Sequence, residues 1–112
     1  MICRYADYRV NGKERLPRQF FDDFMKVAND EAKHFSLLSG RLEELGSYFG
    51  ELPIHASLWE SAQDTSDDLL SRLAIVHMVH EARGLDVNPR TIARFQNVGD
   101  RKSVNILNEI HN

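Results

Sequence analysis

Asn29-Asp30-Glu31-Ala32-Lys33-His34-Phe35 is the stretch that decides the fold, because it lies in the middle of the longest helical pattern in the sequence. Apolar residues recur around it at the spacings of three and four that are typical of one face of a helix. They are Phe20, Phe24, Val27, Phe35, Leu38, Leu42 and Leu45. Glu31 holds a place on this stripe, and His34 lies one turn further along the same face.

A carboxylate on a stripe that faces a core needs compensation. Burial of an ion costs several kcal/mol unless the ion is paired or bound to a metal. Glu and His at positions i and i+3 point the same way from one helix, so Glu31 and His34 could together bind a metal in the core of a helical bundle. A buried hydrogen bond between the two side chains, or a solvated place at the edge of the stripe, also accounts for the pair.

Composition predicts one small globular domain over residues 1–112, with 42% hydrophobic residues to form a modest core. A formal charge of −3 and a pI near 5.9 argue against a protein that coats nucleic acid. We find no apolar run long enough to cross a membrane and no signal peptide, so we expect a cytoplasmic protein. The single cysteine, Cys3, cannot form an internal disulfide. Neither a nucleophile elbow nor a phosphate loop is present, which disfavours hydrolases and kinases.

The first half of the chain is predicted to contain one long helix. Residues 1–16 are expected to be irregular, with a turn at Asn11-Gly12. The helix is expected to run from Pro17 to Leu45 and to end at Gly46, because proline suits a first helical turn and glycine suits the position after the last one.

The middle of the chain is predicted to be a loop followed by a second helix. Residues 47–64 are expected to carry one short helix, with Leu58 and Trp59 covering the end of the core. Thr65-x-x-Asp68 is a capping-box signature, so the second helix is expected to run from about Ser66 to Arg83.

The end of the chain is predicted to form two short helices. Gly84 is expected to stop the second helix, and Asn88-Pro89 to open a short one that reaches about Val98. Gly99-Asp100 is expected to end that helix and to cap the last one, which reaches Asn112 without a stop signal. We therefore expect the chain to be incomplete. The last apolar stripe consists of Val104, Leu107 and Ile110.

The second helix carries three further candidate ligands. One face holds Leu70, Ala74, His77 and Glu81, and another holds Leu69, Leu73, Val76 and His80. A carboxylate again occupies a place where an apolar residue is expected. His77 and His80 could share a metal site, or they could be hydrogen-bonded residues at the edge of the core, and Glu81 is the better candidate for a ligand.

Four strings in this order carry a resemblance that covers nearly everything after Pro17. They are Asp30-Glu31-Ala32-Lys33-His34-Phe35, Arg41-Leu42-Glu43-Glu44-Leu45-Gly46, Leu52-Pro53-Ile54-His55 and Glu81-Ala82-Arg83-Gly84-Leu85-Asp86-Val87. With them the sequence resembles an uncharacterised family of ferritin-like proteins, a domain of unknown function that is distantly similar to the di-iron tRNA hydroxylases.

The resemblance implies an all-α, ferritin-like four-helix bundle. In such a bundle one glutamate from each of two helices, and an E-x-x-H pair from each of the other two, surround a pair of iron or manganese ions. Glu31 and His34 match the E-x-x-H pair of the second helix, and Glu81 matches the lone glutamate of the third. The first helix and the end of the last would lie outside this chain. Glu109 and His111 do not replace the missing pair, because residues two apart project from different faces.

Two functions follow from these expectations. One is a di-metal carboxylate oxidoreductase or metal-handling protein, impaired by truncation, whose ligands here are Glu31, His34 and Glu81. The alternative is a non-catalytic helical interaction domain with a degenerate metal site. Without its first helix the apolar strip of the long helix would be uncovered, so we expect the chain to self-associate. RNA binding without chemistry would have only a loose basic cluster, which consists of Arg9, Lys13, Arg15 and Arg18.

Overall fold

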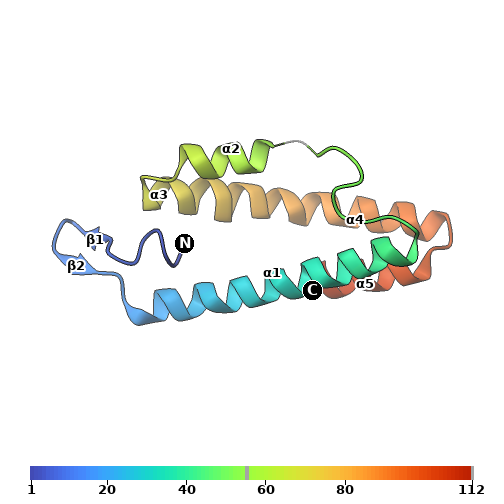
Figure 1. Cartoon of the computed structure of the whole chain (residues 1–112), viewed down its shortest axis with the longest axis horizontal. Coiled ribbons are helices and arrows are strands. Elements are labelled where there is room, and N and C mark those ends of the chain that lie inside the picture. The colour runs from blue at the N-terminus through green and yellow to red at the C-terminus, as the bar shows by residue number, and fades with distance from the viewer. Residues whose placement is uncertain (55, 112) are drawn as a thin grey trace. The chain divides into compact units, whose positions relative to one another are not determined.

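The computed structural model describes residues 1–54 and 56–111, and only the backbone of residues 84–87 (Figure 1). The chain is mostly helical and has one small two-stranded sheet. It divides into an N-terminal unit, residues 1–36, and a C-terminal unit, residues 37–112. The expected single domain over residues 1–112 stays a prediction. His55 and Asn112, which were assigned to the connecting loop and to the end of the last helix, lie outside the described residues.

A short hairpin lies in the N-terminal unit, where the sequence predicted irregular structure. Strand β1 (Arg9–Val10) pairs antiparallel with strand β2 (Glu14–Arg15). Between them, Asn11 and Gly12 have φ values of 52° and 70°, the left-handed conformation that a type I′ turn requires at both central residues. The predicted turn is confirmed. Strands of two residues are too short to give a periodic signal, so the hairpin around the turn was missed.

Helix α1 (Arg18–Glu44) begins one residue after, and ends one residue before, the predicted bounds of Pro17 and Leu45. Gly46 follows it with a φ of 82°. The N–H of Gly46 donates to the carbonyl of Glu43 at 3.0 Å, and the N–H of Ser47 donates to the carbonyl of Leu42 at 2.9 Å. These two bonds form a Schellman motif, which satisfies carbonyls that the end of a helix leaves without partners.

Much of the apolar stripe of α1 is exposed. Val27, Phe35 and Leu45 are 44%, 51% and 57% exposed. The N-terminal unit consists of residues 1–36, in which the hairpin and the first part of α1 are the regular elements, so this unit has no second helix to cover the stripe. This exposure agrees with the expectation that the apolar strip of the long helix is uncovered.

The C-terminal unit is built on one unbroken helical rod. The rod consists of α3 (Leu69–Arg72), the π-helix η1 (Leu73–His80) and α4 (Glu81–Asn97). Helix α2 (Ser57–Asp64) packs against η1, and α5 (Arg101–His111) turns back along α4, as Figure 1 shows. Among the described side chains of this unit, the buried apolar ones are Leu69, Ile92 and Val104.

The rod corrects the prediction of two helices separated near Gly84. The backbone is helical through this residue and through Pro89, which lies inside α4. A proline inside a helix removes one backbone hydrogen bond and usually kinks or ends the helix. Here the packing of α5 on α4 and of α2 on η1 outweighs these local signals, since tertiary context routinely overrides propensity. The predicted end near Val98 is confirmed, because α4 ends at Asn97.

The rod begins three residues later than predicted, with a different cap. Asp68 accepts hydrogen bonds from the N–H groups of Leu70 at 3.2 Å and Ser71 at 3.3 Å, so Asp68 is the N-cap. Thr65, the predicted cap, instead ends α2 and donates its hydroxyl to the carbonyl of Ser61 at 2.7 Å. The capping-box signature identified the region correctly and assigned the wrong residue to the cap.

Two large apolar side chains on α2, one aliphatic and one aromatic, also differ from expectation. Leu58 and Trp59 were expected to cover the end of the core, but they are 57% and 69% exposed. The last apolar stripe is confirmed in part, because Val104 on α5 is buried.

None of the described helices combines the length and the low polarity that crossing a membrane requires.

Candidate metal centre

Glu31 and His34 lie side by side on one turn of α1, as their spacing predicted. The Nδ1 atom of His34 is 3.7 Å from the Oε1 atom of Glu31. Two ligand bonds of about 2.1 Å each can join atoms up to about 4.2 Å apart, so one ion could reach both donors. A carboxylate oxygen and an imidazole nitrogen are ligands that iron and manganese accept. The pair could therefore supply two of the ligands of a metal site.

The surroundings of Glu31 differ from those predicted. Its side chain is 64% exposed, whereas that of His34 is 27% exposed. The carboxylate is solvated and pays no large desolvation cost, so burial does not force it to find a partner. The prediction that Glu31 and His34 lie close together is confirmed. The reason given for it, the burial of the Glu31 carboxylate, is wrong because this side chain is 64% exposed.

Glu81 lies at a change in helical geometry. It is the first residue of α4, directly after the eight residues of η1. π-Helices are rare, and they occur frequently at functional sites. Glu81 is exposed, as are Leu70 and Ala74, which the sequence placed on the same face. Leu69 on the other face is only 4% exposed, so the face of Leu69, and not that of Leu70, begins the core-facing side of the rod.

The two histidines of η1 have different environments. Burial lowers the pKa of His77 below its ordinary value, Arg72 lowers it further, and the charge of Glu81 opposes the shift. Burial therefore favours the neutral form of His77, which is the form of imidazole that binds metal ions. The Nε2 atom of His80 lies 3.2 Å from the hydroxyl of Ser61 on α2. His80 is a hydrogen-bonded residue at the edge of the core, which is one of the two predicted alternatives.

The three predicted ligands are divided between the two units of the chain. Glu31 and His34 belong to the N-terminal unit, and Glu81 belongs to the C-terminal unit. Within the described part of either unit, no three side chains of His, Cys, Asp or Glu come together as a metal site requires. The Nδ1 atom of His111, near the end of α5, is buried and has no hydrogen-bond partner among the described residues. The assignment of Glu31, His34 and Glu81 as metal ligands stays a prediction.

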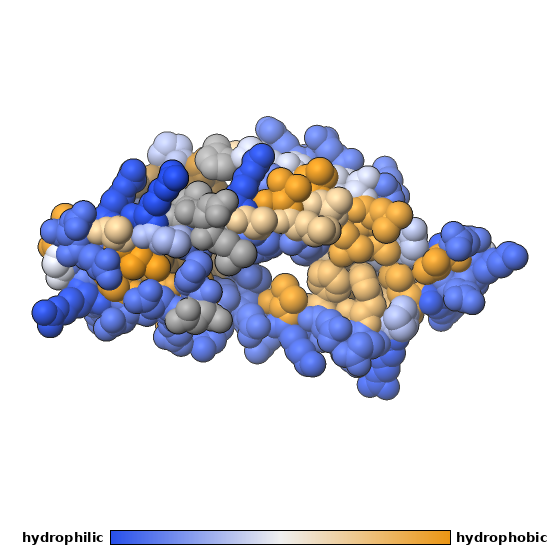
Figure 2. All heavy atoms as spheres, turned by 180° about the vertical axis from the view of Figure 1, so that it is seen from behind, coloured by the Kyte–Doolittle hydropathy of each residue, from blue (hydrophilic) through white to orange (hydrophobic). Residues whose placement is uncertain are grey.

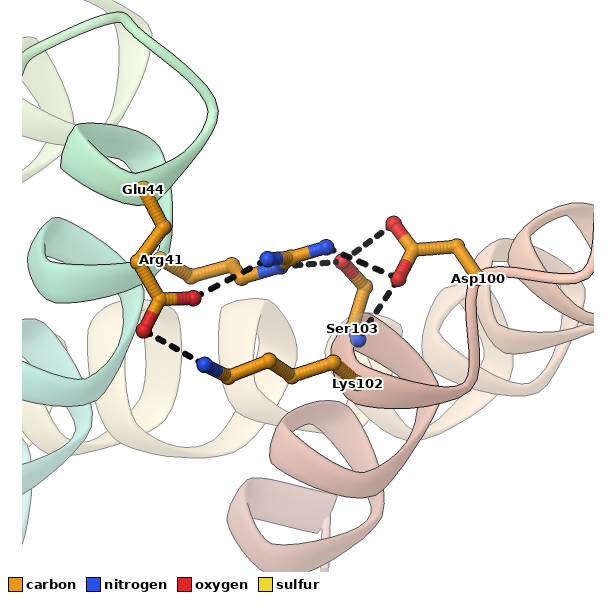
Figure 3. Close-up of polar contacts among 5 residues, drawn as sticks. All are labelled: Arg41, Glu44, Asp100, Lys102 and Ser103. Carbon is orange, nitrogen blue, oxygen red and sulfur yellow. Dashed lines mark hydrogen bonds and ion pairs between the residues drawn. The ribbon is translucent and has the colours of Figure 1, made fainter.

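A polar network that the sequence did not reveal joins the end of α1 to the start of α5 (Figure 3). The guanidinium of Arg41 donates to Asp100 Oδ1 at 2.9 Å, to Glu44 Oε2 at 2.9 Å and to the hydroxyl of Ser103 at 3.0 Å. Lys102 Nζ lies 2.6 Å from Glu44 Oε1. Arg41 and Asp100 are largely buried, with side chains 16% and 22% exposed. The network therefore has a structural role in holding the two helix ends together.

Only one member of this network could be predicted. Asp100 was expected to cap the last helix, and it accepts the N–H of Ser103 at 3.0 Å and the hydroxyl of Ser103 at 2.7 Å. Arg41 is 59 residues away from Asp100 along the chain. No local pattern marks a pair at that separation, so its partner could not be found without the fold.

Acid is expected to weaken this network. Hydrogen bonds from Ser103, and next the charge of Arg41, lower the pKa of Asp100 below its ordinary value of 3.8. Hydrogen bonds from Lys102 and then Arg41 lower the pKa of Glu44 below 4.5. Because both values are lower in the folded state, the stabilisation is complete above the ordinary values and is lost as the pH falls through the folded ones.

Thermal unfolding followed at a series of pH values tests this expectation. The melting temperature of the native chain should fall between about pH 5 and pH 3 by more than that of Asp100→Asn, which has no carboxylate to protonate at this position. Glu60→Gln, a change at an exposed carboxylate of α2, is the matched control and should keep the native pH dependence. If Asp100→Asn and the native chain lose the same stability in acid, the network does not depend on this carboxylate.

An apolar hollow of about 270 Å³ lies beside the network in the C-terminal unit. Six apolar side chains line it. They come from α1, from the residue that follows α1, from α4 and from α5. They are Leu38, Leu42, Leu45, Phe95, Ile106 and Leu107. Figure 2 shows hydrophobic residues that reach the surface in clusters between hydrophilic ones. The hollow contains no chemistry-bearing group other than Arg41 and Ser103, which already bond to Asp100.

Comparison with known proteins identifies a family. The sequence model of the family described as "Protein of unknown function (DUF455)" matches residues 1–112. An "Uncharacterized protein" of Haemophilus influenzae is 43% identical over 102 residues, which are 89% of this chain and 35% of the relative. The chain thus spans about a third of the length of that relative. No solved structure matches the chain.

Proposed function

The chain belongs to the DUF455 family, and we propose that it forms part of a ferritin-like four-helix bundle that binds iron or manganese. The observation that carries the proposal is the Glu31–His34 pair, whose donor atoms lie 3.7 Å apart on one helical turn. Glu81 would supply a third ligand from a different helix. Such a site is built in bundles from glutamates and E-x-x-H pairs that project inward from facing helices.

Each ligand would have its own task. The carboxylates of Glu31 and Glu81 would balance the positive charge of the ions, and His34 would supply a neutral nitrogen ligand. When bound, such ions supply open coordination positions for redox chemistry with an organic substrate, or for the storage or transfer of the metal itself. On this basis the bundle is a di-metal carboxylate oxidoreductase or a metal-handling protein in the cytoplasm.

The openness of α1 supports the bundle. Phe35 and Leu45 on its stripe are 51% and 57% exposed, and further apolar side chains of α1 line the hollow. A stripe of this kind is suited to burial against another helix, as in a bundle. The chain spans about a third of its Haemophilus influenzae relative, so helices encoded outside the matched region are candidates for this contact.

Metal analysis tests the proposal directly. The 112-residue chain would be purified together with a form extended at both ends by the neighbouring coding sequence. We expect about two iron or manganese ions per extended chain, few or none in the short chain, and a loss of metal in the extended Glu31→Ala variant. Glu43→Ala changes an exposed glutamate of the same helix and should keep the metal. If the extended form holds no more metal than Glu31→Ala, the proposal is wrong.

A second function has an observation in its favour. Exposed apolar side chains gather in residues 48–59, where Tyr48, Phe49, Leu52 and Trp59 are each at least 60% exposed. Large apolar patches mark interaction surfaces or aggregation liabilities. The alternative is therefore a non-catalytic helical interaction domain, whose degenerate metal site would leave only an apolar face for contact with itself or another protein.

Self-association is expected for the chain in either case. Sedimentation measured over a range of concentrations should show dimers or larger species, because exposed apolar surface is buried on association. Leu38→Ser/Leu45→Ser should shift the chain toward the monomer, whereas Glu43→Ser, on the same helix, should not. A monomer with a sharp unfolding transition that does not depend on concentration would contradict the expectation.

A further inference from the structure

The hairpin places two arginines directly opposite each other. Arg9 on β1 is the register partner of Arg15 on β2, and both residues are exposed. Directly opposed residues of an antiparallel pair project from the same face, with Cβ atoms about 5 Å apart. Like charges in this position destabilise the pairing. The two strands nevertheless pair here, with the two arginines as register partners.

In the described part of the chain, neither arginine has a charged partner. Among the residues that the structure describes, Arg9 and Arg15 take part in no ion pair, and no side-chain hydrogen bond involves either of them. Lys13, between the strands, adds a third exposed cation. The next arginine, Arg18, is different, since its Nε atom lies 3.7 Å from Asp22 Oδ2.

Charge is also segregated along the sequence. Residues 4–18 contain five basic and two acidic side chains, whereas the rest of the chain contains nine basic and fifteen acidic ones. The overall charge of −3 thus hides a positive segment on an acidic protein. Asn11 and Gly12, both with positive φ, fix the turn that brings the two arginines together.

We propose that Arg9 and Arg15 form a binding site for the phosphate group of a phosphomonoester. Guanidinium groups match phosphate oxygens with two parallel hydrogen bonds each, and hydrogen bonds between charged groups are the strong ones. A dianionic phosphate between the two arginines would replace their mutual repulsion with two attractive contacts. The phosphate could be carried by a small soluble molecule or by a lipid headgroup. This site is separate from the proposed metal ligands and does not depend on them.

Titration of the 112-residue chain with inorganic phosphate tests the site. The ¹⁵N-labelled chain should show shifts of the Arg9 and Arg15 Nε–H signals, with binding that weakens as sodium chloride is raised. Arg9→Gln/Arg15→Gln should bind about tenfold more weakly, since a hydrogen bond to a charged group contributes about 1.5–3 kcal/mol. Arg4→Gln/Arg18→Gln changes the net charge equally and should keep the affinity within about twofold.

A second measurement keeps the test meaningful if the variant alters the hairpin. Without ligand, Arg9→Gln/Arg15→Gln should strengthen the cross-strand backbone contacts seen by NMR, because the like-charge repulsion is removed. Vesicles that contain phosphatidic acid distinguish the two sources. A lipid site binds these vesicles more tightly than it binds inorganic phosphate, and a site for a soluble phosphomonoester does the reverse. The proposal is overturned if both double variants lose the same affinity, or if neither probe shifts the signals of Arg9 and Arg15.

Discussion

Glu31→Gln and His34→Gln are each expected to weaken the binding of manganese to the extended protein by about 10–100-fold or more. Loss of a residue that only supports a metal ligand costs about 10–100-fold in affinity, and loss of a ligand itself should cost no less. Glutamine keeps the length of the glutamate side chain and removes its charge, so the helix should remain intact. The helix propensity of glutamine is close to that of glutamate.

Competition between the protein and a chelator of known affinity measures the effect. Glu43→Gln, on the same helix and exposed like Glu31, is the control for a general loss of negative charge. If Glu43→Gln weakens manganese binding as much as Glu31→Gln does, the effect of Glu31→Gln is due to net charge, and Glu31 is not a ligand. If His34→Gln, which leaves the net charge unchanged, keeps the native affinity, His34 is not a ligand. A lowered affinity in Glu31→Gln and His34→Gln alone would support direct coordination by both.

Ile92→Ala is expected to lower the free energy of unfolding by about 2 kcal/mol or more. Ile92 is 8% exposed on α4, which packs along α5, where Val104 is also 8% exposed. Removal of buried methyl and methylene groups loses their transfer free energy and leaves a cavity. The C-terminal unit has few fully buried apolar residues, so each of them accounts for a large share of its stability.

Denaturation by urea measures this effect. Ile92→Val removes a single methylene and should cost about 0.5–1.5 kcal/mol. Met78→Ala is a surface control, because Met78 on the same rod is 67% exposed and its truncation should change the stability by less than about 0.5 kcal/mol. If Ile92→Ala destabilises the chain no more than Met78→Ala does, α4 and α5 do not share a packed core at this position.

Long, regular features of the fold could be predicted from the sequence. The stripe of α1 continues for seven turns and ends at a glycine whose φ of 82° few other residues adopt, so both of its ends were predicted to within one residue. The break near Gly84 and Pro89 was predicted from local signals and is absent from the backbone, since packing outweighs them. The hairpin was too short to show a period, and the Arg41–Asp100 contact has no local signature.

Only part of the candidate site could likewise be predicted from the sequence. That Glu31 and His34 meet follows from the geometry of a helix alone, and the structure confirms their proximity. Their burial depends on what covers α1, which a single helix pattern does not contain, and here the prediction was wrong for Glu31. The face on which Glu81 lies could not be deduced either. Eight residues of π-helix precede it, and their wider winding changes the register that an α-helical pattern assumes.

Whether the nitrogen of His34 binds a metal decides between the proposed metal site and a purely structural role for this helix. Pulsed electron paramagnetic resonance of the extended protein loaded with Mn(II) detects a histidine nitrogen bound to the ion through its hyperfine coupling. We predict this coupling in the native protein and in Glu43→Gln, and its loss in His34→Gln with the helix content unchanged. A coupling that persists in His34→Gln, or that is absent from the native protein, would contradict the assignment of this helix as the source of the metal ligands.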